Sequence, residues 1–310
     1  MNTVLLLEAY REYLLARGFS PRVVKEYPAS VRHFLAHVEA SEGRLDIRLF
    51  SRAHVEDYHG ALLVRPSNRK RPLGASTRLL RLLHVRSFFR FLHLTGRIAW
   101  DPTAALLLPK ASKPLPAHLL TEEEAGRLLL AVNLKDPLGV RDRALLELLY
   151  GSGLRVSEAL GLTLSDVDLG GEALVVMGKG QRQELVPVLG EAKRAMDHYL
   201  HFARPKLLRR GEAAEVVFLS LRGRPLHAID VAARIRVYAQ KAGLSQRPTP
   251  HSFRHSCATH LLKAGADIRF IQRLLRHKSI STTQVYTRLD LRDVQEALRK
   301  YHPRERDTNE

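Results

Sequence analysis

The 310-residue sequence predicts a mainly α-helical protein with a small antiparallel β-sheet, divided into two domains. Apolar residues recur at intervals of three and four along most of the chain, as they do on the buried face of an amphipathic helix. Two short runs typical of strands, residues 173–177 and 183–188, flank a Gly-Lys-Gly turn, which predicts a β-hairpin. A segment with three prolines, residues 106–118, separates two stretches that are each long enough to form a core.

The first domain is predicted to consist of helices. Their expected ranges are residues 4–16, 20–39, 51–64 and 75–92. Ser20 and Pro21 provide a capping residue followed by proline at the first helical position. Pro28 lies inside the second helix, where a proline kinks the helix or shifts its start.

Residues 58–100 contain no Asp or Glu, although they are rich in arginine. A solvated helix face normally mixes charges of both signs, so this one-sign segment favours a surface that contacts DNA phosphates. The alternative is a charged face with no partner. The candidate DNA contacts are Arg69, Lys70, Arg71, Arg78, Arg81 and Arg86.

The whole chain is strongly basic, with a net charge of +18 and a pI of about 10.4. Nucleic acid is therefore the expected partner, because cations favour contact with a polyanion. An anionic membrane surface is the alternative, but no apolar run has the length needed to span a bilayer. The single cysteine, Cys257, excludes an internal disulfide and fits a reducing cytoplasm, and the N-terminus has no signal-peptide pattern.

Composition also places the domain boundary. We expect a DNA-binding domain over residues 1–108, a linker over 109–117 and a second domain over 118–310. Thr121 and Glu124 form a capping box that opens the second domain. Residues 1–110 contain 18 Lys and Arg against 9 Asp and Glu, and the remainder contains 32 against 23, so each part has the same net charge of +9. Such a balance fits two domains that close around a duplex.

In the second domain, further helices are predicted at residues 140–150, 191–202, 228–242 and 291–298, and a third strand at 216–220. Arg234, Arg236 and Lys241 are expected to face outward from the helix at 228–242.

Residues 249–288 concentrate groups suited to phosphate chemistry. His251 and Arg254 lie three residues apart in a helical pattern, so we expect both on one side of the helix, away from the core. A second helix follows, with His277 at its end, and a hydroxyl-rich turn leads to Tyr286. Upstream, Arg155 lies between two apolar helical runs, and Lys179 occupies the tip of the hairpin.

These segments, in this order, resemble the catalytic domain of a tyrosine recombinase of the phage integrase family, most closely the Xer group. The motifs that carry the resemblance are GSGLRVSEAL, the GKG hairpin, HSFRHSCATHLL and HKSISTTQVYT. It implies an N-terminal SAM-like four-helix core-binding domain and site-specific DNA recombination in a synaptic tetramer, without cofactor or metal. It also implies a C-terminal helix that docks on a neighbouring subunit; packing within the same chain is the alternative.

The resemblance assigns roles to six residues, and Tyr286 is the nucleophile that forms a 3′-phosphotyrosyl bond. An ordinary tyrosine has a pKa near 10, so it needs a base or a cationic field to react at neutral pH. Arg155 and Arg254 suit the charge on the non-bridging oxygens, because a guanidinium donates two parallel hydrogen bonds. His251 is then a general base or phosphate donor, and Lys179 is the general acid that protonates the 5′ oxygen.

His277 is expected to be a second phosphate donor. Glu158 either orients an active-site histidine or simply occupies the first turn of a helix, where a carboxylate is favoured. Arg276 departs from the family pattern, which commonly has glycine there. Since arginine resists a left-handed turn, either the turn is right-handed or His277 is displaced.

Other interpretations remain open at this stage. The set His251, His255, Cys257 and His260 suggests a metal, but Cys257 belongs to the apolar stripe, so we expect His255 and His260 to serve packing or hydrogen bonding. Chromosome or plasmid dimer resolution is the expected Xer-type role. The alternatives are an integrase or resolvase of a mobile element, a type IB topoisomerase-like activity and a catalytically silent DNA-binding protein.

Overall fold

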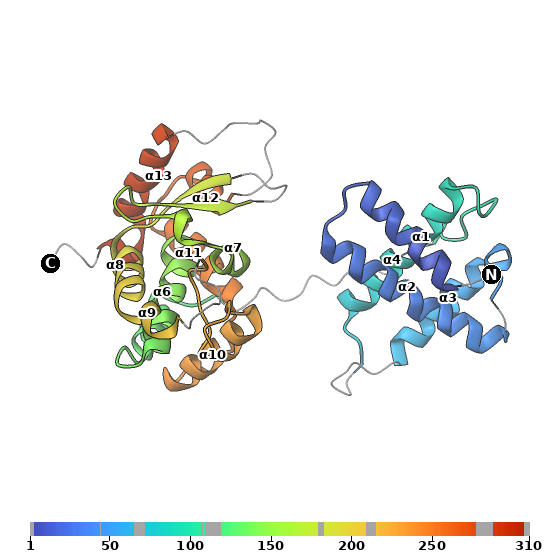
Figure 1. The fold of residues 1–310 in the computed structure, drawn as a ribbon, viewed down its shortest axis with the longest axis horizontal. Helices are drawn as coiled ribbons and strands as arrows, with labels where there is room; N and C mark the ends of the chain where they lie inside the picture. Colours follow the sequence, from blue (N-terminus) through green and yellow to red (C-terminus); the bar gives the residue numbers. More distant parts are fainter. Residues whose placement is uncertain are drawn as a thin grey trace. The chain divides into compact units, whose positions relative to one another are not determined.

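The computed structural model describes residues 3–43, 45–64, 72–106, 108, 119–178, 183–208, 215–276 and 288–306. The chain forms two compact units, Met1–Pro114 and Leu115–Glu310 (Figure 1). Both are mainly helical, and a small antiparallel sheet lies in the second, so the expected fold class is confirmed. The expected linker, residues 109–117, lies outside the described residues.

The N-terminal unit contains the predicted helices. They are α1 (Thr3–Ala16), α2 (Pro21–Glu42), α3 (Arg52–Val64) and α4 (Ala75–Leu94). Pro28 is buried inside α2, which is one helix from Pro21 to Glu42. The core is rich in aromatic rings that pack edge to face, with Phe34 against Tyr58 and Phe89.

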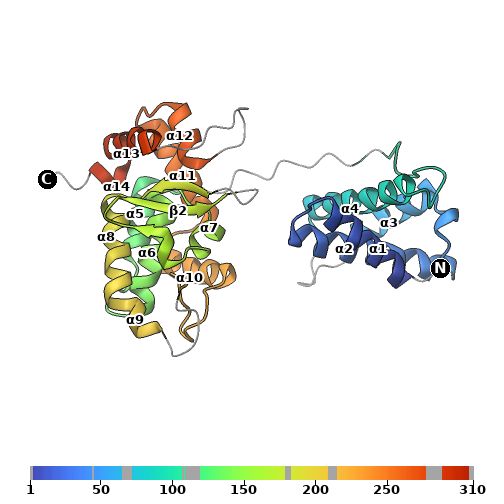
Figure 2. The same ribbon diagram turned by 45° about the horizontal axis from the view of Figure 1, so that its top comes forward.

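The C-terminal unit is built around one buried helix. Its elements as far as the sheet are α5 (Glu122–Leu130), α6 (Pro137–Gly151), α7 (Val156–Leu160), β1 (Val167–Asp168), β2 (Ala173–Met177) and β3 (Gln183–Pro187). The later elements are α8 (Gly190–His198), a π-helical turn (Tyr199–Ala203), α9 (Arg204–Leu207), α10 (Ala228–Lys241), α11 (Pro250–Lys263), α12 (Ile268–Leu275), α13 (Arg288–Tyr301) and α14 (Pro303–Arg306). Helices α8 and α11 both pack on α6, which is buried along most of its length (Figures 1 and 2). The capping box of Thr121 and Glu124 opens α5 as predicted.

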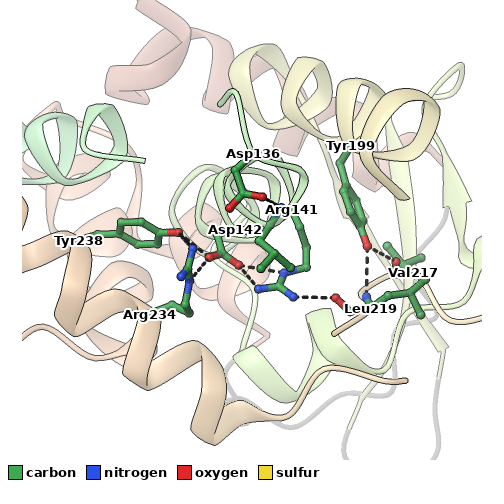
Figure 3. A network of polar contacts seen from close by, with 9 residues as sticks. Asp136, Arg141, Asp142, Tyr199, Val217, Leu219, Arg234 and Tyr238 are labelled. Carbon is green, nitrogen blue, oxygen red and sulfur yellow. Dashed lines mark hydrogen bonds and ion pairs between the residues drawn. The ribbon is translucent and has the colours of Figure 1, made fainter. Parts of the chain in front are cut away.

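Figure 3 shows a polar network that fastens α10 to α6. The buried carboxylate of Asp142 accepts from Arg141 at 2.6 Å on one oxygen, and from Arg234 and Tyr238 at 2.6 Å each on the other. Arg234 therefore does not simply face outward as predicted: its side chain is 37% exposed but its guanidinium is bound to Asp142.

The same network fastens residues 216–220 to the core. Arg141 donates to the Leu219 carbonyl at 2.7 Å, and the Tyr199 hydroxyl lies between the Val217 carbonyl and the Leu219 amide, at 2.8 and 3.1 Å (Figure 3). The predicted third strand at this place is wrong, because these residues form only isolated bridges, Thr163 with Val216 and Leu219 with Pro225.

The described part of the sheet has the antiparallel order β1-β2-β3, and its third strand is β1. Register pairs Val176 with Glu184, so the Glu184 side chain lies on the same face of the sheet as the buried Val176. Strands β2 and β3 match the predicted hairpin.

The C-terminal helices pack against their own catalytic unit. Val294 and Leu298 of α13 are buried in its core. Arg299 pairs with Glu172, and Arg304 of α14 binds Glu147 at 2.7 Å. In this single chain the helix packs within its own unit, and its docking on a neighbouring subunit stays a prediction.

None of the helices in the described ranges is both long and apolar enough to cross a membrane.

Candidate active site

Helix α11 carries two of the predicted site residues, and they differ in exposure. Thr249 caps its start by accepting from the Ser252 amide, and Pro250 occupies the first turn. His251 is exposed, and its ring centroid lies 4.2 Å from that of His255. Arg254 is only 3% exposed, so the expectation that it points away from the core is wrong.

Arg254 is buried because main-chain carbonyls receive its guanidinium. It donates to the Gly153 carbonyl, in the loop between α6 and α7, and to the Leu275 carbonyl at the end of α12. Burial lowers the pKa of Arg254 to about 10, and the charges of Arg155 and Arg276 act in the same direction. Three segments that are distant in sequence are thus held around one cation.

Arg155 and Glu158 sit at the start of α7. Arg155 is exposed, and its Nη1 donates to Glu158 Oε1 at 2.5 Å, while its amide donates to Oε2 at 2.8 Å. Glu158 Oε2 is also 3.9 Å from Arg254 Nη1. Arg155 and Arg254 are therefore brought together on either side of one carboxylate. Glu158 does occupy the first turn of a helix, and its contacts with described residues are with arginines.

Arg276 joins Arg155, Glu158 and Arg254 in one charged cluster, a role of its side chain that was not predicted from the sequence. It ends α12 in the left-handed conformation, with φ of 52° and ψ of 49°, so the right-handed alternative is wrong. Its guanidinium donates to Glu158 Oε2, and its Nε lies 3.2 Å from Glu184 Oε2. The available signal was the arginine itself, at a position where the family commonly has glycine. From the sequence alone, that departure was considered only for its effect on the backbone turn.

The charges in the cluster do not balance. Three guanidiniums (Arg155, Arg254 and Arg276) face two carboxylates (Glu158 and Glu184), which leaves one positive charge among these residues. Burial alone would raise the pKa of Glu158, but Arg276 and Arg155 together hold it below its usual value. The carboxylate is thus ionised, and the excess positive charge suits an oxyanion such as a phosphodiester.

Three other predicted site residues, Lys179, His277 and Tyr286, lie outside the described residues.

The histidines near α11 have separate environments. His260 is buried and its Nδ1 is 2.8 Å from the Tyr150 hydroxyl, as expected of a hydrogen-bonded core residue. His255 is exposed, so the same expectation is wrong for it. Cys257 is fully buried, and burial raises the pKa of its thiol to about 12. In the described parts of the chain, no three His, Cys, Asp or Glu side chains are grouped to hold a metal ion.

The predicted DNA contacts of the N-terminal unit lie on or before α4. Arg78 donates to the Leu73 carbonyl at 2.5 Å, and Arg81 and Arg86 are half-buried on the same helix. Arg69, Lys70 and Arg71 fall outside the described residues.

The sequence matches known families over both units. Residues 118–292 match the phage integrase family, and residues 7–96 match its N-terminal SAM-like domain. Tyrosine recombinase XerC of Myxococcus xanthus is 39% identical over 307 residues, which cover 96% of this chain and 98% of that protein. Tyrosine recombinase XerD of Shewanella oneidensis is 38% identical over 306 residues, with 96% and 97% covered.

Solved structures show the same fold. A lambda integrase dimer bound to a core site has a TM-score of 0.66 at 21% identity, with 90% of this chain and 93% of that chain covered. A lambda integrase tetramer bound to a Holliday junction has a TM-score of 0.65 at 20% identity, with 92% and 80% covered. With family matches in both units and similarity to Xer proteins over almost its whole length, the chain belongs to the phage integrase family and is a site-specific tyrosine recombinase.

Proposed function

We propose that the chain cleaves and rejoins DNA through Tyr286, with Arg155 and Arg254 binding the scissile phosphate. The observation that carries this assignment is their arrangement on either side of Glu158, which leaves one positive charge uncancelled. His251, exposed one turn before Arg254, is the general base or a further phosphate donor. Lys179 is the general acid, and His277 is a second donor.

The reaction is a transesterification that consumes no cofactor. The Tyr286 oxygen attacks the phosphorus and loses its proton to a base, a 3′-phosphotyrosyl bond forms, and the bond to the 5′ oxygen breaks. Lys179 gives its proton to that leaving oxygen. A 5′ hydroxyl from another strand then reverses the steps, so the phosphodiester energy is kept. Both arginines stabilise the charge on the non-bridging oxygens throughout.

We place this chemistry on paired DNA sites in a tetramer, in the cytoplasm, with resolution of chromosome or plasmid dimers as the role. The lambda integrase tetramer on a Holliday junction supports the tetrameric assembly, and the similarity to XerC and XerD supports the Xer-type role. The net charge of +18 supports a DNA partner. Arg69, Lys70, Arg71, Arg78, Arg81 and Arg86 are the proposed contacts of the N-terminal unit.

Covalent trapping tests the proposal. Nicked duplexes with a randomised core are incubated with the protein, and denaturing gels separate the covalent adduct. Sequencing the DNA in the adduct then identifies the captured site. Wild-type protein is expected to form the adduct, and Tyr286→Phe is expected to bind the same DNA with unchanged affinity but to form none, because it lacks the attacking oxygen. Adduct formation by Tyr286→Phe would move the nucleophile to another residue.

A further inference from the structure

Arg276 stands at the end of α12 in a backbone conformation that glycine adopts freely and arginine resists. Its side chain is nonetheless only 4% exposed, among charged neighbours. Burial lowers the pKa of its guanidinium, and Glu158 and Glu184 act against that shift. The backbone offers no advantage for an arginine at this position, so the contacts of the side chain must supply the reason for it.

Those contacts join three elements. Nη2 donates to Glu158 Oε2 on α7, Nε faces Glu184 Oε2 on β3 at 3.2 Å, and Nη1 donates to the Leu274 carbonyl of its own helix at 3.2 Å. The guanidinium thus fixes the end of α12 to the start of α7 and to the second strand of the hairpin. Its three nitrogens already face Glu158, Glu184 and the Leu274 carbonyl, so it acts through these groups.

The important partner is Glu158, since this carboxylate also holds Arg155. Its Oε1 accepts from Arg155 Nη1 at 2.5 Å, and its Oε2 is shared by the Arg155 amide and Arg276. The Arg155 side chain is 42% exposed, so few other groups restrain it. Without Arg276, Glu158 Oε2 would be free to move toward Arg254 Nη1, now 3.9 Å away, and Arg155 would lose its fixed acceptor.

We propose that Arg276 is a positioning residue for DNA strand cleavage: its buried guanidinium fixes the Glu158 carboxylate and, through it, the Arg155 guanidinium. The inference rests on the proposed function, because it assigns Arg276 a task only if Arg155 binds the scissile phosphate. Glu184 supplies the second anchor that prevents the Arg276 guanidinium from following Glu158.

The single-turnover rate of adduct formation tests the role of Arg276. It is measured with a saturating concentration of the duplex that the wild-type protein captures. Arg276→Gly is the main variant, because it removes the side chain and gives the left-handed turn the residue that suits it, so loss of activity is not caused by backbone strain. We expect its rate constant to fall about 10- to 100-fold, as for outer partners of an active-site group, with DNA affinity unchanged. Arg276→Lys, which keeps the charge, is expected to recover part of the rate.

A double-mutant cycle separates positioning from a general structural role. If Arg276 acts through Arg155, adding Arg276→Gly to Arg155→Lys slows the reaction by less than about threefold, whereas independent effects would multiply. Arg273→Gln is the matched control, since Arg273 lies on the same helix with an exposed side chain, and its rate is expected to equal that of the wild type. Melting temperatures identify any variant that fails to fold.

The outcomes distinguish the two levels of the argument. No adduct with wild-type protein contradicts the proposed function and removes the basis of the inference. A wild-type adduct together with a wild-type rate for Arg276→Gly contradicts only the inference, as do effects of Arg276→Gly and Arg155→Lys that multiply.

Discussion

At the scale of single residues, the site depends on a glycine as well as on cations. Gly153 has φ of +59°, and a Cβ on it would lie 2.9 Å from Leu275 Cδ2 and 3.6 Å from the Cys257 sulfur. Its carbonyl also accepts a hydrogen bond from Arg254. Any side chain here would therefore strain the backbone and push against the helices that frame the arginine cluster.

We expect Gly153→Ala to lower the free energy of unfolding by about 1 to 3 kcal/mol, through left-handed strain and overpacking. Adduct formation should fall as well, because the carbonyl that receives Arg254 moves. Gly126→Ala is the control: Gly126 lies inside α5 with no atom within 4 Å of an added Cβ. Alanine there should stabilise the protein by about 0.5 to 1 kcal/mol. Urea unfolding measures both, and equal effects of the two substitutions would refute the role of Gly153.

The same scale shows what helical periodicity can predict. It identified Cys257 as a core residue, because local spacing decides which face is buried. It could not place Arg254, since the carbonyls that make its burial tolerable belong to residues 101 positions earlier and 21 positions later. Arg276 was missed for the same reason: its carboxylate partners lie on α7 and β3.

At the scale of elements, helices were predictable and the third strand was not. The long helices carry their own apolar stripes, and α5, α6 and α11 also begin with side-chain caps, which are local properties. β1 has only two residues, too few for a period, and it exists because β2 pairs with it. Residues 216–220 look like a strand because they are apolar, but Tyr199 and Arg204 already bind the Val217 carbonyl.

Asp142 gives an element-scale prediction, because its carboxylate joins α6 to Arg234 and Tyr238 of α10. Asp142→Ala leaves the buried guanidinium of Arg141 without its carboxylate and should lower the free energy of unfolding by about 3 to 5 kcal/mol. Arg234→Ala should cost less, since the Arg234 side chain is 37% exposed and its charge is screened by solvent.

Denaturant unfolding measures both losses of stability. If the m values of the two variants are equal, the midpoints show directly which substitution costs more. Arg236→Ala, on the exposed face of α10, is the control and should change stability by less than about 0.5 kcal/mol. A larger loss for Arg234→Ala than for Asp142→Ala would contradict the assignment of Asp142 as the central group.

At the scale of the whole molecule, net charge is the property that can be read most directly from the sequence. The net charge of +18 and the acid-free residues 58–100 predicted a polyanion as partner. The family matches, one in each unit, agree with the predicted two-part organisation. A set of motifs in a fixed order can be recognised from sequence, whereas the position of each side chain cannot. Composition could not supply the internal pairing of charges, which is a property of the folded chain.

The salt dependence of DNA affinity tests whether this positive charge contacts DNA phosphates. Arg86 and Arg90 both lie on α4 within the acid-free segment, and their replacement by alanine should flatten the slope of log affinity against log salt by about 0.9 per lost phosphate contact. Arg52→Ala is the control, because Arg52 pairs with Glu56 at 2.7 Å and its charge is already compensated. An unchanged slope in the α4 variant would show that this face does not bind phosphate.

The way Arg254 is held has a consequence for the free protein. Main-chain carbonyls fix the direction of its guanidinium but contribute no negative charge, and Glu158 is shared with two other arginines. The folded chain without DNA therefore places three guanidiniums around two carboxylates, and under the proposed function we expect a bound phosphodiester to relieve the repulsion between them. We expect this repulsion to lower the stability of the free enzyme, and we expect binding of the strand phosphate to recover that free energy.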